Sequence, residues 1–335
     1  MVGRISRRET SATSGLLFDV GGTYLRWGLW WDGGLKRWGE FAHAAFPTPS
    51  AAFEVALAQA ELEGRWKDPV LLSVAGPVWE QEATLTNRPE WSFSASAFRR
   101  EFGWKRVRLV NDLTALALGL GHRETKAEVW QQGEERQDSP APRLVVAVGT
   151  GLGNALCFGS FRPWVWSGEA GHSDLPLEDI ALFRALRRRA SCLSRETVLS
   201  GEGLALLYRV LSELEGKAAE RVDPGEVSQR AAEGCDPIAV SACCIWSELL
   251  GKTVGDLVLV AGAWQGCDLA GGVISGMGKA FDQAAFLKGF LAKERMGALL
   301  SKVPVRFFSQ RNLSLLGLGR LLESKGFGKN FGAGL

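Results

Sequence analysis

The chain has 335 residues, which is long for a single hydrophobic core, so we expect two domains. Apolar residues make up 46% of it and charged residues 23%, the proportions of a soluble globular protein, which exclude a disordered or fibrous chain. The net charge of +2 favours neither a nucleic-acid nor a membrane-surface partner, and no uncharged apolar run of about 18 residues predicts a membrane span.

Cysteine usage and the N-terminus indicate where the protein works. The six cysteines form no CxxC pair and have no histidine at ligand spacing, which argues against a zinc site and a disulfide framework. Residues 1–13 are polar and basic and lack the apolar core of a signal peptide, so we expect a disordered tail. Both observations favour a cytoplasmic protein.

Strands and helices alternate along the first third of the chain. Apolar patterns predict strands at Leu16–Val20, Tyr24–Trp31, Leu35–Ala42, Pro69–Val74 and Val107–Val110. Capping signals predict helices from Ser50 to about Glu63 and over Ser94–Phe102, and Leu113–Gly121 follows the last of these strands. The polar segment His122–Pro142 predicts an exposed excursion.

The rest of the chain is mostly helical after one more strand pair. Helices are predicted at Leu177–Arg189, Gly203–Glu215, Gly225–Glu233, Asp236–Leu250 and Leu313–Leu322, with a late strand at Val303–Phe308. Strand-and-helix units early and helices late predict an α/β fold with two lobes.

Two glycine-rich turns of similar design lie about 130 residues apart, within Leu16–Trp30 and Leu144–Phe158. Each stands between two apolar strands, and each consists of residues with small side chains. Without Cβ atoms in the way, backbone N–H groups can approach a ligand closely, so two such hairpins can hold a polyphosphate from both sides. Together the two turns predict an ATP-dependent transferase, whereas either alone reads as an ordinary hairpin.

Phosphoryl transfer to an alcohol also needs a metal partner and a base. Asp19 ends a strand beside the first turn, where a carboxylate can face a hydrated Mg²⁺ on the phosphates, and Thr23 can donate its hydroxyl. Asp112 follows an apolar strand, and ligands of α/β sheets collect at the carboxyl ends of strands. Asp112 is therefore the candidate base, although an aspartate there also suits a helix N-cap.

A cluster of small and polar residues, 168–172, is the candidate acceptor pocket. Glu169 and His172 stand three residues apart between glycines and alanine, so both can reach one polyol. Glu196 can join them from a helix, although by itself it reads as a solvated surface residue. These side chains indicate a sugar as the phosphoryl acceptor.

The order of these motifs resembles that of the bacterial-type glucokinase family, within the actin, hexokinase and Hsp70 ATPase superfamily. The resemblance spans roughly Leu16 to Leu322. The motifs that carry it are Asp19-Val20-Gly21-Gly22-Thr23, Ala75-Gly76-Pro77-Val78 with Thr86-Asn87 and Trp91, Val110-Asn111-Asp112, Gly149-Thr150-Gly151-Leu152-Gly153, Gly168-Glu169-Ala170-Gly171-His172 and Val198-Leu199-Ser200-Gly201.

The resemblance implies a two-lobed actin-like ATPase fold, ribonuclease H-like, with a ligand cleft between the lobes. The small α/β lobe would hold residues 14–111 and about 312–330, and the larger α+β lobe residues 112–311. The implied reaction is ATP-dependent phosphorylation of the glucose 6-hydroxyl, giving glucose 6-phosphate and ADP, with Mg²⁺ accompanying ATP. Family members are often homodimers, so a homodimer is implied too.

The resemblance also assigns roles to individual residues. Asp112 would be the general base, and the sugar would be bound by Asn111, Asp112, Glu169, His172 and Glu196. The two phosphate loops would use Asp19, Gly21, Gly22, Thr23, Gly149, Thr150, Gly151 and Gly153. The adenosine contact would be made by Gly271 and Gly272.

Two departures from the family pattern lie near the nucleotide motifs. Tyr24 follows the first turn where the family has asparagine or a small residue, and Asp268 precedes the adenosine segment. Two alternatives stay open: a kinase for another hexose, such as mannose or an N-acetyl amino sugar, and a sugar-binding regulator without turnover. An intact Asp112 argues against the regulator.

Overall fold

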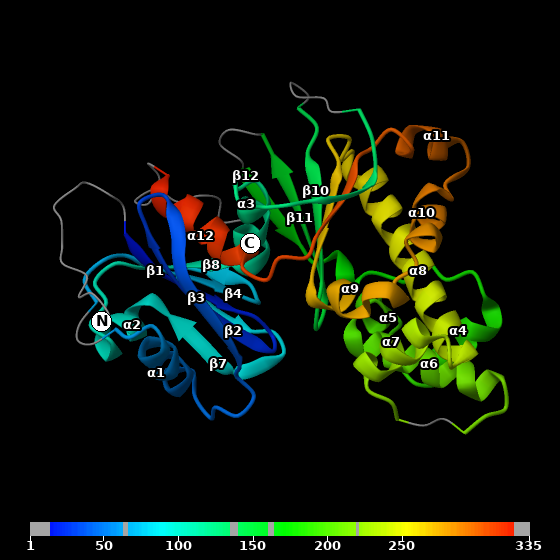
Figure 1. Cartoon of the computed structure of the whole chain (residues 1–335), viewed down its shortest axis with the longest axis horizontal. Helices are drawn as coiled ribbons and strands as arrows, with labels where there is room; N and C mark the ends of the chain where they lie inside the picture. The colour runs from blue at the N-terminus through cyan, green and yellow to red at the C-terminus, as the bar shows by residue number, and fades with distance from the viewer. Residues whose placement is uncertain (1–13, 63–65, 135–139, 160–163, 219–220, 325–335) are drawn as a thin grey trace. The chain divides into compact units, whose positions relative to one another are not determined.

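The computed structural model describes residues 14–62, 66–134, 140–159, 164–218 and 221–324 (Figure 1). The chain divides into two compact units. Unit 1 contains the described residues up to Gly119 and from Ser314 onward, and unit 2 contains those from Leu120 to Leu313. The predicted tail, residues 1–13, lies outside the described residues.

Unit 1 is built on a five-stranded sheet in the order β3-β2-β1-β4-β8. Its strands are β1 (Gly15–Val20), β2 (Tyr24–Trp31), β3 (Gly34–Ala42), β4 (Val70–Val74) and β8 (Val107–Asn111). The first three form the predicted antiparallel meander, whereas β4 and β8 join in parallel. A second sheet contains β5 (Val78–Trp79), β6 (Glu82–Leu85) and β7 (Arg88–Ser94).

Alternating side chains of β1 reach two different hydrophobic clusters, because successive strand residues point to opposite faces. Leu16 and Phe18 belong to the cluster that includes α1 (Pro49–Gln59) and α2 (Ala95–Glu101), whereas Leu17 belongs to the one that includes α3 (Asp112–Leu120) and α12 (Leu313–Glu323). The sheet is therefore covered by helices on both faces. Thr48, two residues before the predicted Ser50, caps α1 because Pro49 takes the first helical position.

The C-terminal helix α12 is part of unit 1 although it is far from it in sequence. Gly317 lies so close to α3 that a Cβ there would overlap the carbonyl oxygen of Ala115. Arg320 donates to the carbonyl oxygen of Leu118 at 2.6 Å. Because of these contacts α3 also packs in unit 1, whereas the sequence prediction began the larger lobe at Asp112.

Unit 2 contains a six-stranded sheet in the order β12-β11-β10-β13-β14-β9. Its strands are β9 (Glu128–Gln131), β10 (Arg143–Val148), β11 (Leu152–Phe158), β12 (Trp164–Gly168), β13 (Cys267–Ala270) and β14 (Val305–Phe308). The five strands β12-β11-β10-β13-β14 repeat the order and directions found in unit 1: β10, β11 and β12 form an antiparallel meander, and β13 and β14 join β10 in parallel. The two glycine hairpins therefore occupy equivalent places, β1–β2 and β10–β11.

The prediction of an exposed excursion over His122–Pro142 was wrong for its central part. β9 pairs with β14 at the sheet edge, and the Trp130 ring stacks on Phe307 and Phe281 with ring centres 5.1 and 4.8 Å apart. Because polar side chains flank Trp130, composition alone did not predict this strand.

Most of the remaining described residues of unit 2 are helical. The α-helices of unit 2 are α4 (Ile180–Arg187), α5 (Arg195–Val198), α6 (Gly201–Leu214), α7 (Pro224–Glu233), α8 (Pro237–Ala261), α9 (Gly272–Met277), α10 (Gln283–Leu291) and α11 (Gly297–Leu300), with short 3₁₀ turns η1 (Ala170–His172), η2 (Gly278–Ala280) and η3 (Glu294–Met296). α8 runs 25 residues and lies beside α10 (Figure 1). It continues past the predicted end at Leu250, and at Gly251 the backbone of α10 packs so closely that a Cβ would overlap the carbonyl oxygen of Phe286.

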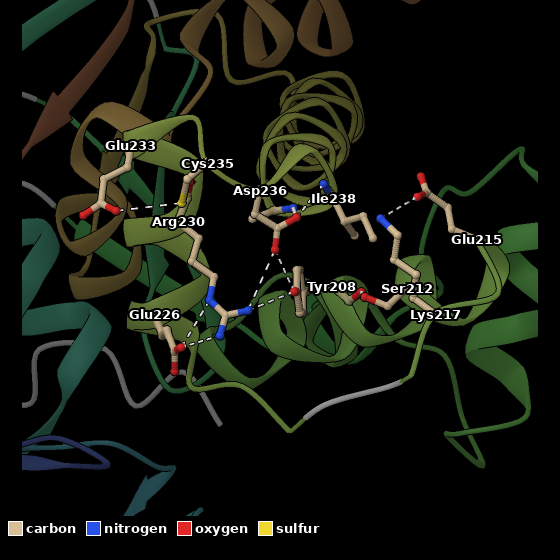
Figure 2. Close-up of polar contacts among 11 residues, drawn as sticks. Tyr208, Ser212, Glu215, Lys217, Glu226, Arg230, Glu233, Cys235, Asp236 and Ile238 are labelled. Atoms are coloured by element: carbon tan, nitrogen blue, oxygen red, sulfur yellow. Dashed lines mark hydrogen bonds and ion pairs between the residues drawn. The ribbon is translucent and has the colours of Figure 1, made fainter.

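A polar cluster joins three helices in unit 2 (Figure 2). Tyr208 of α6 donates its hydroxyl to Asp236 Oδ2 at 2.7 Å and accepts a hydrogen bond from Arg230 of α7 at 3.1 Å. Asp236 caps α8 by accepting from the amide of Ile238 at 2.9 Å. Burial acts to raise the pKa of Asp236, but hydrogen bonds from Tyr208 and from backbone amides, with the charge of Arg230, outweigh it and lower the pKa overall.

Candidate active site

The first glycine turn is closed by its own backbone and held by a buried histidine. The amide of Gly21 donates to the carbonyl oxygen of Tyr24 at 3.0 Å. His43, which follows β3, places its Nε2 2.8 Å from the carbonyl oxygen of Gly21, and its backbone amide donates to Thr23 at 3.1 Å. His43 therefore fixes both ends of the turn, while Thr23 remains exposed.

Asp19 lies inside the fold rather than at an open surface. It is 4% exposed; its Oδ1 accepts from the Ser73 hydroxyl at 2.6 Å, and its Oδ2 pairs with Arg26 at 3.0 Å. Both oxygens thus have protein partners, and this arrangement does not fit direct ligation of a metal ion. Across the described ranges, no three acidic, histidine or cysteine side chains gather as a metal-binding group.

Asn111 and Asp112 stand where β8 ends and α3 begins. Asn111 Oδ1 accepts from the amides of Leu113 at 3.1 Å and Thr114 at 3.3 Å, and its Nδ2 donates to Gly76 at 3.1 Å. Asp112 Oδ1 accepts from the amide of Leu113 at 2.9 Å. The bond that caps the helix at its third amide therefore comes from Asn111, and Asp112 is the first residue of the helix.

In unit 2 the second glycine turn is held by a hydrogen bond to Glu196, a predicted sugar ligand. The amide of Gly149 donates to the carbonyl oxygen of Gly151 at 2.9 Å, which closes the turn. The amide of Leu152 donates to Glu196 Oε2 at 2.8 Å. Glu196 is half-buried, which does not fit the alternative in which it is a solvated surface residue.

The loop that carries Glu169 and His172 packs on the same turn. Gly171 is buried and lies against the carbonyl group of Leu152, where a Cβ would overlap the oxygen. The two side chains are 68% and 55% exposed, and His172 Nε2 lies 4.0 Å from Glu169 Oε2. The pair is thus exposed and close enough to contact one small ligand.

The adenosine segment approaches the strand that leads into the second turn. Gly271 has a φ of +127° and lies against the backbone of Val148, two conditions that favour glycine. The amide of Gly201, at the start of α6, contacts the carbonyl oxygen of Gly149 at 3.4 Å. Unit 2 therefore brings the predicted phosphate, sugar and adenosine segments together around Val148–Leu152.

Asp268, the departure near the adenosine segment, is 1% exposed within β13. Its Oδ1 lies 2.7 Å from Arg306 Nε, and its Oδ2 forms an ion pair with Arg143 Nε at 2.8 Å. Its charge is thus matched inside the sheet, and its carboxylate points to two arginines.

Comparison with known proteins gives the family. Residues 16–325 match the glucokinase family. The chain belongs to the glucokinase family. It is 33% identical over 311 residues to the glucokinase of Nitrobacter hamburgensis, covering 90% of this chain and 95% of that one.

Solved structures agree with this family. The glucokinase from an Antarctic psychrotroph superposes with a TM-score of 0.75 at 27% identity, over 93% of this chain and 99% of that one. A ROK family glucokinase from Streptomyces griseus, in complex with glucose and AMPPNP, has the same fold with a TM-score of 0.63 at 20% identity, over 93% and 99% of the two chains. The prediction of an α/β actin-like ATPase fold of the glucokinase family is confirmed.

Sequence reasoning missed two residues that hold the glucokinase motifs. Asn154 Oδ1 accepts from the amide of Ala170 at 2.9 Å and thereby fixes the loop before His172. His43 holds the first turn, as described above. For Asn154 the signal was its place in β11 beside the turn; for His43 the sequence held none.

Among the described helices, none combines the length and apolar character that crossing a membrane requires.

Proposed function

We propose that this chain transfers the γ-phosphoryl group of ATP to the 6-hydroxyl of glucose, giving glucose 6-phosphate and ADP. The observation that carries this proposal is the family match over residues 16–325, a range that contains every residue assigned a role below. The likeness of the fold to a glucokinase in complex with glucose and AMPPNP supports the same substrates.

Asp112 is the proposed general base. Its carboxylate takes the proton of the 6-hydroxyl while the oxygen attacks the γ-phosphorus and the bond to the ADP oxygen breaks. Asn111, whose side chain is anchored to Gly76 and to α3, serves as a neighbouring sugar ligand. Because Asn111 supplies the cap at the third amide of α3, the helix does not depend on Asp112 for that bond.

The remaining roles follow the described segments. Glu169, His172 and Glu196 bind sugar hydroxyls, and the turns at 21–23 and 149–153 present backbone amides to the phosphates. Gly271 and Gly272 contact the adenosine. Magnesium arrives with ATP as part of the substrate, and the contact proposed for Asp19 is indirect, through water.

Compartment and assembly are also proposals. Cysteine usage supports a reducing compartment, the cytoplasm. The homodimer is supported by the family resemblance, and light scattering of the purified chain tests it.

Initial rates of ADP formation with Mg-ATP, measured across glucose, mannose, fructose, galactose and N-acetylglucosamine, test the activity. We expect glucose to be phosphorylated most efficiently and Asp112→Asn to lower kcat by about 10²–10⁴-fold, the usual contribution of a general base. Asp32→Asn, an exposed aspartate in the β2–β3 turn, is the matched control and keeps wild-type rates. A near-normal kcat for Asp112→Asn would refute the base assignment.

Glu169→Gln tests the sugar pocket. It should raise the KM for glucose by roughly tenfold, the loss of one charged hydrogen bond, with a smaller change in kcat. Glu178→Gln, whose carboxylate is 85% exposed and pairs with Lys252, serves as the control. An unchanged glucose KM would remove Glu169 from the pocket. If no sugar turns over while glucose still quenches tryptophan fluorescence, the chain is a sugar-binding regulator.

A further inference from the structure

We propose that Glu196 is a positioning residue for the second glycine turn as well as a sugar ligand, so that sugar binding and the geometry of this phosphate loop are coupled. The inference rests on the proposed function and adds a role that neither the motif nor the family match assigns. The residues that carry it all lie within unit 2.

One carboxylate oxygen holds the turn. Glu196 Oε2 accepts from the amide of Leu152 at 2.8 Å, across 44 residues of sequence. The carboxylate also fills the space beside Gly151, where an added Cβ would overlap Oε2 and lie 2.9 Å from Cδ. Within the described part of the chain Oε1 has no hydrogen-bond partner, so this oxygen can accept a sugar hydroxyl.

The backbone that carries Glu196 is fixed from both sides. Ser194 and Thr197 form a capping box at the start of α5, which holds the helix in place. Trp246 of α8 donates its indole N–H to the carbonyl oxygen of Val198 at 2.9 Å, at the other end of α5. The backbone of Glu196 is therefore anchored at both ends of α5, and the end of its side chain is the part that can move easily.

The same short helix is tied to the sugar loop. Asp174 and Ser194 form an isolated antiparallel bridge, and the amide of Arg195 donates to Ser173 at 2.9 Å. The N–H of Leu152 donates to Glu196, and its carbonyl group lies against Gly171 of the sugar loop. A sugar that reorients the Glu196 carboxylate therefore changes the geometry of the turn. By linkage, phosphates bound at the turn change the affinity for sugar.

Gly151→Ala tests the coupling directly, because the substitution lies in the second glycine turn and the measured quantity is the affinity for glucose. The added methyl displaces the flexible end of Glu196, so the fold is kept while the carboxylate leaves its position. Gly276→Ala, in α9, is the matched control: its added Cβ meets no atom within 4 Å, and neither Gly151 nor Gly276 has a positive φ. The dissociation constant of glucose is measured without nucleotide, from tryptophan fluorescence.

We expect Gly151→Ala to weaken glucose binding by roughly tenfold or more, the loss of one charge-assisted hydrogen bond, and Gly276→Ala to stay within about twofold of wild type. Thermal midpoints of both variants verify that they fold. Wild-type glucose affinity in Gly151→Ala would overturn the coupling.

Two variants of Glu196 give the reciprocal readout, the KM for ATP at saturating glucose. Glu196→Gln keeps an oxygen that accepts from Leu152, so its KM for ATP should stay within about twofold, whereas Glu196→Ala should raise it by roughly tenfold. Both weaken glucose binding. An unchanged KM for ATP in Glu196→Ala would overturn the positioning role. A wild-type chain that binds glucose without phosphorylating it would refute the proposed activity, and the fluorescence comparison would still decide the coupling.

Discussion

Replacing Asp268 with asparagine should destabilise unit 2 by about 3 kcal/mol. Removing one partner of a buried ion pair typically costs 3–5 kcal/mol, because the remaining charge is left unpaired. Here two arginines lose their common partner, but their side chains are 26% and 20% exposed, so water compensates part of the loss. Asparagine also keeps one oxygen for Arg306. These two effects place the expected value at the lower end of the range.

Differential scanning calorimetry gives the assay, since two units can unfold in separate transitions. For a unit of 150–250 residues each kcal/mol corresponds to about 2–4 °C, so the transition of unit 2 should fall by roughly 6–12 °C. Glu226→Gln, which removes an exposed pair with Arg230, is the control and should change stability by less than about 1 kcal/mol. If Asp268→Asn behaves like this control, the reasoning about the buried triad is refuted.

Two further predictions concern packing and pH. The pKa of Asp236 is lowered in the folded state, so its contribution to the free energy of unfolding is present at pH 7 and is lost as the pH falls below about 4. The difference in unfolding free energy between wild type and Asp236→Asn, measured by urea unfolding, should therefore shrink as the pH falls below about 4. A difference that stays constant down to pH 2 would contradict this. Gly251→Ala should cost about 1–3 kcal/mol by forcing α8 from Phe286, and unchanged unfolding would show that the helices separate freely.

Local patterns predicted the two glycine hairpins because the signals are local: strand alternation and small residues at the turn. They also located the cap before α3, but not which residue makes it. Asn111 and Asp112 are both good capping residues, and only the structure shows that the bond to Thr114 comes from Asn111. Propensity alone does not separate two adjacent capping residues.

Contacts between distant segments were outside the reach of sequence reasoning. The placement of Glu196 beside the second turn depends on a hydrogen bond to Leu152 across 44 residues of sequence. The role of Asn154 depends on a hydrogen bond to Ala170 across 16 residues. The buried triad around Asp268 combines three strands that are distant in sequence. Each residue taken alone reads as an ordinary polar side chain, because its role is set by partners brought together by folding.

The position of α12 determines the order in which this chain can fold during synthesis. Leu17, Trp30 and Leu71 share a cluster with α12, and Trp30 donates its indole N–H to Glu323 at 3.1 Å. Ribosomes need on the order of 10–40 s, at roughly 5–20 residues per second, for the roughly 190 residues between Leu120 and Leu313. During that time one face of the first sheet has emerged with α3 but without α12, the second helix that covers it. Unit 1, although made first, is completed last.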